Sequence, residues 1–427
     1  MKHLKTALII AALSTLGPFS TDTYFPSFPA LAAHFHVSVI QVQSTLSFYL
    51  VALAVMNLFH GSLSDSFGRR SVIEVTLAVY IVSALACVVA PSFGWLLALR
   101  VIQGLAAGAG MIVSRAMIRD LFHGVEAQQL MSQVAMLGGA GPIIAPIFGG
   151  WLHVWFGWRG PFVFLGLLGI ALLCACHFGL PESLPAHLRH TFHPGKLSRA
   201  YMATLKNPAF LLSCFALAFG GGGFLLYVAT APDVVLNIFH LSETQFGWLF
   251  VPLISGLVLG SAVGARLMGR IPSARLVRLG FGLMAAGAAV NIAASLWLAP
   301  RVPWAVLPLT LYTFGFSFVA PVATIEGLDM IPQRKGLAAS LQGFTQILVF
   351  ALISGFAARL VFHSGPRHAV GLAILMGLSW LAYVGSKRFS SLPTELGLPA
   401  NRPGDENSFK TIGNLHEQKQ TALDLKL

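Results

Sequence analysis

The chain has 427 residues, of which 56% are hydrophobic and only 10% are charged. An ordinary soluble domain carries roughly 25% charged residues, so this composition excludes a water-soluble globular protein. The net charge of +12 does not indicate nucleic-acid binding, because the basic residues fall in short loops between long apolar runs. The four cysteines lie in apolar segments without a C-x-x-C pair, which gives no support for a disulfide framework or a zinc site.

Twelve apolar runs follow one another along the chain. Each is close to the ~20 residues that a helix needs to cross the ~30 Å hydrocarbon core of a bilayer. A helix also satisfies its own backbone hydrogen bonds inside lipid. We therefore expect an all-α polytopic membrane protein with twelve transmembrane helices, at about 6–27, 41–60, 71–91, 95–117, 129–151, 161–180, 208–230, 245–265, 276–298, 304–325, 338–360 and 369–386.

A polar stretch at 181–207 divides these runs into two six-helix bundles, which we place at 1–180 and 208–388. We expect the stretch to be a cytoplasmic middle loop and residues 389–427 to be a flexible cytoplasmic tail. His187, His190 and His193 recur at intervals of three in the middle loop. We interpret them as solvated side chains and predict no metal site.

The distribution of basic residues predicts the topology. With the N-terminus in the cytoplasm, cytoplasmic segments hold 22 of the 27 lysines and arginines, as the positive-inside rule requires. Most tryptophans then fall near the opposite membrane boundary. Lys2 and Lys5 before an apolar run, with Ala30-Leu31-Ala32 after it, also resemble a cleavable signal peptide. An uncleaved first span fits better, because it gives an even number of spans with both termini cytoplasmic.

The loop after the second span contains Gly61, Asp65, Gly68, Arg69 and Arg70. Glycines permit a tight turn, and Asp65 can accept charge-assisted hydrogen bonds from a neighbouring arginine. Such a contact can hold one conformation and break in another. The alternative is an ordinary basic loop that only follows the topology rule.

Two charged residues interrupt apolar spans of the first half. Arg100 lies inside the fourth span, where a cation costs at least ~2.5 kcal/mol, so it should face a cavity and have a partner. Asp22 is an acid within the first span. Desolvation favours the neutral form of a carboxyl group, whereas a nearby arginine favours the ionised form. We therefore hypothesise that Asp22 binds and releases protons and that Arg100 tunes it. The alternatives are an interfacial Asp22 and an Arg100 that extends to the interface.

The fifth span is dense in glycine and proline. Prolines bend a helix, and glycines let another backbone approach closely. Generic small-residue packing is the alternative interpretation. The residues concerned are Gly138, Gly141, Pro142, Pro146, Gly149 and Gly150.

Together these segments resemble the major facilitator superfamily. Residues 61–70 are similar to its G-x-L-x-D-x-x-G-R-R loop, Arg100 to Gly104 to its fourth-span R-x-x-Q-G motif, and Gly138 to Gly150 to its antiporter motif. Thr21 to Pro26, the fifth-span motif and Arg115-x-x-x-Arg119-Asp120 resemble the Bcr/CflA (bicyclomycin-resistance) drug:proton antiporters. In the second half, Arg266 stands where the loop motif has aspartate.

The resemblance implies two six-helix bundles around a central cavity, in a multi-pass protein of the bacterial inner membrane. It also implies export of small lipophilic or amphipathic compounds, including antibiotics, in exchange for protons. Asp65, Arg69, Arg70 and Arg119 would then latch the cytoplasmic gate. Aromatic and polar residues that could line the cavity are Thr21, Tyr24, Tyr49, Gln103, Phe224, Tyr227, Tyr312, Gln342 and Gln346.

Three alternatives remain open. The chain could export one metabolite or a siderophore, or it could be a proton symporter on the same fold. A membrane sensor or membrane-embedded enzyme would need a soluble domain or a catalytic constellation, and we predict no enzyme. We expect a monomer in the lipid bilayer whose partners are a small-molecule substrate and protons. We expect no cofactor and no nucleic acid, with the proton gradient as the source of energy.

Overall fold

The computed structural model describes residues 2–189 and 191–391, and within these ranges the chain folds into helices without a named β-strand. The expected tail lies outside the described residues from 392 onward. The long helices of the first half are α1 (Lys2–Asp22), α3 (Val39–Asn57), α5 (Arg69–Val88), α6 (Phe93–Leu121), α7 (Gly124–Phe156) and α8 (Gly160–Gly179). Those of the second half are α10 (Pro208–Ala229), α11 (Gly247–Leu267), α12 (Ser273–Trp297), α13 (Leu307–Asp329), α14 (Lys335–Leu352) and α16 (Gly365–Ser391).

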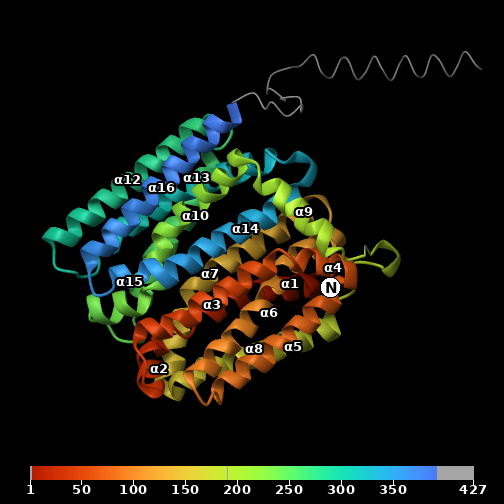
Figure 1. Cartoon of the computed structure of the whole chain (residues 1–427), viewed down its shortest axis with the longest axis horizontal. Coiled ribbons are helices and arrows are strands. Elements are labelled where there is room, and N and C mark those ends of the chain that lie inside the picture. Colours follow the sequence, from red (N-terminus) through yellow and green to blue (C-terminus); the bar gives the residue numbers. More distant parts are fainter. Residues whose placement is uncertain (1, 190, 392–427) are drawn as a thin grey trace, which may run out of the picture.

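Short helices connect the long ones. They are η1 (Phe25–Ser27), α2 (Phe28–Phe35), α4 (His60–Phe67), η2 (Gly157–Arg159), η3 (Ala186–Leu188), α9 (Pro194–Leu205), η4 (Asp233–Ile238) and η5 (Pro332–Arg334). A π-helical turn, η6 (Ile353–Ala357), and α15 (Ala358–Val361) extend α14. The two halves of the chain lie side by side in Figure 1, with α3, α7 and α14 near the boundary between them.

The twelve expected spans are confirmed. Ten segments of the described chain are long and apolar enough to cross a membrane. One of them runs over 39 residues, from Gly141 to Gly179. At 1.5 Å per residue it would measure about 58 Å, nearly twice the hydrocarbon thickness. It contains the end of α7, the η2 turn and α8, and therefore crosses twice. With α1, which has 21 residues, the number of spans is twelve.

The first span ends earlier than expected, at Asp22 rather than near residue 27. Pro26 stands at the start of η1 and Pro29 at the start of α2. A proline lacks a backbone N–H and disfavours helical geometry in the residue before it. The two prolines therefore break the helix into α1, η1 and α2, and they place Asp22 at a helix end.

The ends of several helices follow from local capping. Ser38 and Gln41 form a reciprocal capping box at the start of α3. Ser92 accepts a hydrogen bond from the backbone N–H of Trp95 at the start of α6, and Asn207 accepts one from Phe210 at the start of α10. We call the membrane face at which α1 begins the N-terminal face, and the other the opposite face.

Glycines on α6 set how closely its neighbours approach. A Cβ atom on Gly104 would overlap the backbone carbonyl of Tyr49 on α3, and one on Gly110 would lie 3.0 Å from the carbonyl oxygen of Leu13 on α1. In α11, Cβ atoms on Gly256 and Gly260 would overlap residues of α13 in the same way. Small residues allow such close packing of membrane helices.

The middle segment is more ordered than a loop, because residues 194–205 form the helix α9. Its Tyr201 hydroxyl donates a 2.7 Å hydrogen bond to the carbonyl oxygen of Leu58, at the end of α3. Tyr201 also packs in a cluster with Phe210, Ala338 and Leu341 of the second half. Thus α9 contacts both halves near the N-terminal face.

The packing of α6 against α3 gives a first prediction. Gly104→Ala should lower the free energy of unfolding by about 1–3 kcal/mol, the usual effect of overpacking, because the new methyl group meets rigid backbone. The matched control is Gly94→Ala at the start of the same helix, where a Cβ atom meets only the Ser92 hydroxyl, at 3.9 Å. Thermal unfolding in mild detergent would measure both. Equal melting temperatures for the two variants would contradict this packing.

Candidate coupling and gating site

Arg100 of α6 is completely buried. Its guanidinium carbon lies 4.4 Å from the centre of the Tyr24 ring and 4.4 Å from that of the Tyr49 ring. Nη2 donates to the carbonyl oxygen of Ser20 at 3.1 Å, and Nη1 donates to the amide oxygen of Gln103. Two aromatic rings and two oxygen acceptors thus stabilise a cation inside the first half.

Asp22 ends α1 and is only 5% exposed. In the described part of the chain, no ion pair joins Asp22 to Arg100, although Tyr49 lies within electrostatic reach of both. The structure therefore brings the two residues into one buried region without pairing them.

Several buried polar atoms of this region have no hydrogen-bond partner within the described protein. They are Arg100 Nε, Gln103 Nε2 and Thr23 Oγ1. A buried polar group without a partner costs about 1–3 kcal/mol. These atoms are therefore available to water or to a polar group of a substrate.

A second cluster of charges lies at the N-terminal face. Arg69 contacts Asp65 at 2.5 Å and Asp120 at 3.0 Å, and its backbone N–H donates to Glu182 at 2.9 Å. Ser183 donates to Asp120 at 3.0 Å. Gly68 has a φ of +98°, which favours glycine. The cluster joins α4, the start of α5, the end of α6 and the middle segment.

Other residues of the predicted gate lie elsewhere. Arg70 pairs with Glu74 at 2.7 Å and donates to the carbonyl oxygen of His177 at 2.6 Å. Arg115 and Arg119 are exposed, and neither pairs with a carboxylate in the ranges that the structure covers. A Cβ atom on Gly61 would meet nothing within 4 Å. The expected latch is thus centred on Arg69.

The glycine- and proline-rich motif lies within α7, which continues as a helix through Pro142 and Pro146. Gly138 lies in the same helix. Cβ atoms on Gly141 and Gly149 would meet Pro18 and Thr23 of the first half, and one on Gly150 would overlap the backbone of Glu243 in the second half. This end of α7 is therefore in backbone contact with both halves.

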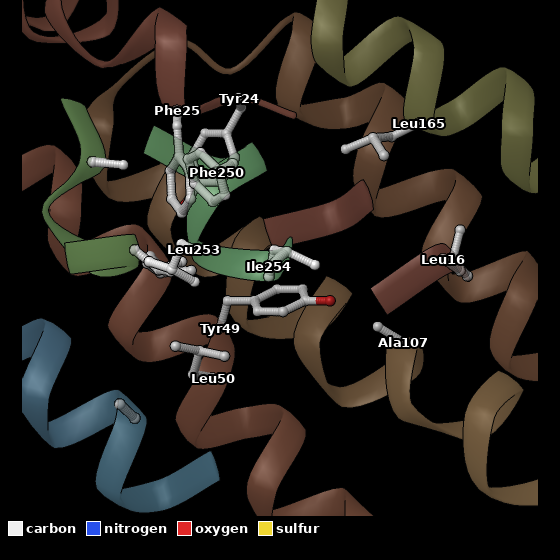
Figure 2. Packing of buried hydrophobic residues seen from close by; sticks show 14 of the residues in the cluster. Leu16, Tyr24, Phe25, Tyr49, Leu50, Ala107, Leu165, Phe250, Leu253 and Ile254 are labelled. Carbon is white, nitrogen blue, oxygen red and sulfur yellow. The ribbon is translucent and has the colours of Figure 1, made fainter. Parts of the chain in front are cut away.

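Further contacts join the halves at the opposite face. Phe25 of η1 stacks against Phe250 of α11, with ring centres 6.5 Å apart, and Figure 2 shows the two rings beside Leu253 of α11. Gln43 of α3 donates to the carbonyl oxygen of Ser354 at 3.0 Å, and Ser47 donates to the Ser354 hydroxyl at 3.0 Å. We call these contacts, with that of Gly150, the opposite-face seam.

The nine suggested cavity residues do not form one group. Tyr24, Tyr49 and Gln103 surround Arg100, and Thr21 donates to carbonyl oxygens of its own helix. The five residues of the second half have other neighbours. Phe224 packs against Phe316, and the Tyr227 hydroxyl accepts a hydrogen bond from the Asn291 amide. Tyr312 and Gln342 donate to the carbonyl oxygens of Gly220 and Thr324. Gln346 is exposed.

Tyr227 lines a cavity of about 310 Å³ at the opposite face, with Asn237, Asn291, Trp304 and His368. Beside it, Asp233 is fully buried and contacts three donors. They are the backbone N–H of His363 at 2.7 Å, the His363 imidazole at 2.7 Å and the Asn237 amide at 2.9 Å. Asp233 lies beyond α10, at the start of η4, and the sequence interpretation did not foresee its partners.

The sequence interpretation also missed the polar contacts of the seam. Gln43 and Ser47 stand four residues apart in an apolar helix, so they lie on one face, which marks that face as buried against a polar neighbour. Their partner, Ser354, is 311 residues beyond Gln43, and no spacing rule reveals a contact at that distance.

Several bacterial transporters are similar to this chain. The bicyclomycin resistance protein homolog of Haemophilus influenzae is 28% identical over 88% of this chain and 94% of its own length. The uncharacterized MFS-type transporter YdgK of Bacillus subtilis is 29% identical over 92% of this chain and 96% of its own length. The multidrug transporter MdfA of Edwardsiella ictaluri is 27% identical over 89% and 93%.

Solved structures share the fold at lower identity. The xylose transporter XylE from E. coli, in a partially occluded inward open conformation, superposes with a TM-score of 0.66 at 15% identity, over 93% of this chain and 99% of its own. The human organic anion transporter MFSD10 superposes with a TM-score of 0.66 at 18% identity, over 90% of this chain and 99% of its own. The family model described as Major Facilitator Superfamily matches residues 10–358. The chain therefore belongs to the major facilitator superfamily.

Proposed function

We propose that this protein exports small lipophilic or amphipathic compounds, antibiotics among them, in exchange for protons. Relatives named as a bicyclomycin resistance protein homolog and a multidrug transporter match over nearly the whole chain, which supports the drug-efflux assignment. The observation that carries the mechanism is the buried carboxyl group of Asp22, which shares a region with Arg100 but does not pair with it. We propose no cofactor and a monomeric protein.

Asp22 is the proton carrier in this scheme. A carboxyl group removed from water, without a paired cation, can take up a proton without breaking an ion pair. Arg100 supplies a fixed positive charge nearby. When Asp22 is neutral, this charge disfavours the binding of any further positive charge in the same region. Binding of substrate and binding of the proton then disfavour each other, and this reciprocal coupling is what exchange requires.

The N-terminal face is the cytoplasmic face in our proposal, and the protein spans the bacterial inner membrane. The excess of lysine and arginine at this face supports the orientation. The structure then has its opposite-face seam closed toward the outside. Opening outward separates Gly150 from Glu243 and Phe25 from Phe250, while the Arg69 cluster strengthens closure on the cytoplasmic side.

The central prediction concerns Asp22. Asp22→Asn should abolish proton-driven export while the protein remains in the membrane, because an amide group does not bind and release protons at physiological pH. In inverted, energised vesicles, substrate should trigger proton release by the wild type and not by the variant. Asp329→Asn, at an exposed acid paired with Lys335 at 2.6 Å, is the control. Full coupling in Asp22→Asn would remove this residue from the mechanism, and co-directional movement of substrate and proton would exclude exchange.

A second prediction tests the surroundings of Arg100. Arg100→Lys keeps the charge but loses the planar stacking between two rings. We expect export to fall about tenfold, which corresponds to ~1.4 kcal/mol. The control, Arg159→Lys, makes the same change beside the Trp158 ring at the opposite face and should transport normally. Unchanged export by Arg100→Lys would show that charge alone suffices.

A third prediction tests the opposite-face seam. Gly150→Leu should hold the halves apart at this face, because the new side chain overlaps the Glu243 backbone. In a cysteine-free background carrying Ser354→Cys, an impermeant maleimide added from the opposite face should label Gly150→Leu faster. Gly94→Leu, where a Cβ atom meets only the Ser92 hydroxyl at 3.9 Å, is the control. Equal labelling of the two variants would mean that Gly150 does not keep the seam closed.

A further inference from the structure

The helices α12 and α16 lie next to each other at the edge of the second half, away from the boundary between the halves (Figure 1). A groove of about 840 Å³ runs between them, lined among others by Val277, Phe281, Ala285, Met376, Trp380 and Val384. Gly282 and Gly377 also line it, and Cβ atoms on either would meet nothing within 4 Å. The two glycines thus leave the groove open where side chains would fill it.

The surface around the groove is strongly apolar. Leu279 of α12 and Ile374, Leu378 and Leu381 of α16 are all more than one-third exposed. In a transmembrane protein, exposed apolar side chains of this kind face the acyl chains of lipid. The groove therefore opens toward the bilayer and not toward water.

Two cations line the end of the groove at the N-terminal face, Arg278 of α12 and Lys387 of α16. Arg278 is exposed, and its Nε donates at 3.3 Å to the carbonyl oxygen of Ala274 in its own helix. Within the described residues it pairs with no carboxylate. Lys387 contacts Glu326 at 2.6 Å and lies 5.6 Å from the centre of the Tyr383 ring. Arg275 lies one helical turn before Arg278, on the same side.

The length of the groove matches one leaflet of a bilayer. Its lining extends from Ala274 to Ala285 on α12 and from Lys387 to Met376 on α16. From the cations inward, seven steps of 1.5 Å from Arg278 to Ala285 give ~10 Å on α12, and eleven steps from Lys387 to Met376 give ~16 Å on α16. Half of a ~30 Å hydrocarbon core is ~15 Å. The cations stand at the level of the headgroups and the apolar walls at the level of the acyl chains.

We propose that this groove is a binding site for one anionic phospholipid. The lipid phosphate contacts the Arg278 guanidinium, which suits phosphate geometry, and Lys387, which is paired with Glu326, lies beside it. An acyl chain lies along Phe281, Met376 and Trp380. The open backbone at Gly282 and Gly377 lets that chain sink between the helices.

The combination of charge and shape selects this ligand over others. A free phosphate would leave the apolar length of the groove unused. A second copy of the chain would need acidic residues opposite Arg275 and Arg278. An anionic phospholipid satisfies both ends of the groove at once, and basic pockets between helices at this depth suit such headgroups. The site does not depend on the direction of transport.

The test uses Trp380 as a local probe. The full chain is reconstituted in phosphatidylcholine vesicles that contain a minor fraction of phosphatidylglycerol with brominated acyl chains, which quench nearby tryptophan. The signal of Trp380 is the difference between the wild type and Trp380→Phe. Brominated phosphatidylcholine at the same fraction is the reference lipid. We expect phosphatidylglycerol to quench Trp380 with a relative affinity at least fivefold above that of phosphatidylcholine.

Charge variants locate the headgroup. Arg278→Gln should reduce the preference about fivefold, the equivalent of ~1 kcal/mol for one basic side chain near a lipid surface. Arg278→Lys should retain part of it. Arg270→Gln removes a cation at the same face outside the groove lining and should retain all of it. Because the Arg278 side chain is exposed and has no carboxylate partner in the described structure, its variants should fold normally.

Four outcomes would overturn the proposal. Equal quenching by the two lipids would show that the groove has no headgroup preference. An equal loss in Arg270→Gln and Arg278→Gln would show diffuse attraction to the membrane face. Displacement by inorganic phosphate would indicate a site for the free anion. Displacement of the lipid by a compound that the protein exports would indicate a path for substrate.

Discussion

A guanidinium group buried between two tyrosine rings, with no carboxylate partner among the described residues, is the constraint on which the first half of the molecule depends. A cation inside a membrane protein is costly, by at least ~2.5 kcal/mol. Here the Tyr24 and Tyr49 rings, the Ser20 carbonyl and the Gln103 amide offset that cost. These groups come from α1, the turn after it, α3 and α6, so stabilising the charge also fixes how three helices pack. Gly104 allows the approach that this packing needs.

The two halves treat buried charge differently. In the first half, Asp22 and Arg100 share a region without an ion pair, and several donors nearby have no partner in the described protein. In the second half, the buried carboxylate of Asp233 contacts three donors. Three donors thus surround the carboxylate of Asp233, whereas Asp22 forms no ion pair within the described residues. This difference supports placing proton exchange in the first half.

Much of the fold could be predicted from the sequence, because a run of ~20 apolar residues has few alternatives to a transmembrane helix. The Arg69–Asp65 contact was expected because an acid and an arginine stand close together in one short loop motif, and the burial of Arg100 follows from its place in an apolar span. Arg100 was expected to tune Asp22, but the two side chains form no ion pair in the described structure. Sequence periodicity does not give the direction of a side chain at a helix end. To predict that the first helix ends at Asp22, one would need to know how strongly Pro26 and Pro29 together disfavour its continuation. The seam between Gln43 and Ser354 depends on tertiary packing alone.

The connection between the halves has a mechanical consequence. A flexible linker would place little restraint on the movement of the two halves relative to each other. Here α9 is helical, is embedded in a cluster with α10 and α14, and is tied to Leu58 of α3 by the Tyr201 hydroxyl. Such a segment is a rigid helical connection, held to the end of α3 by contacts that can break. Movement of the halves at this face must either carry α9 with both partners or break the Tyr201 hydrogen bond and the packing of Leu58 in the same cluster, so the connection limits the range of that movement.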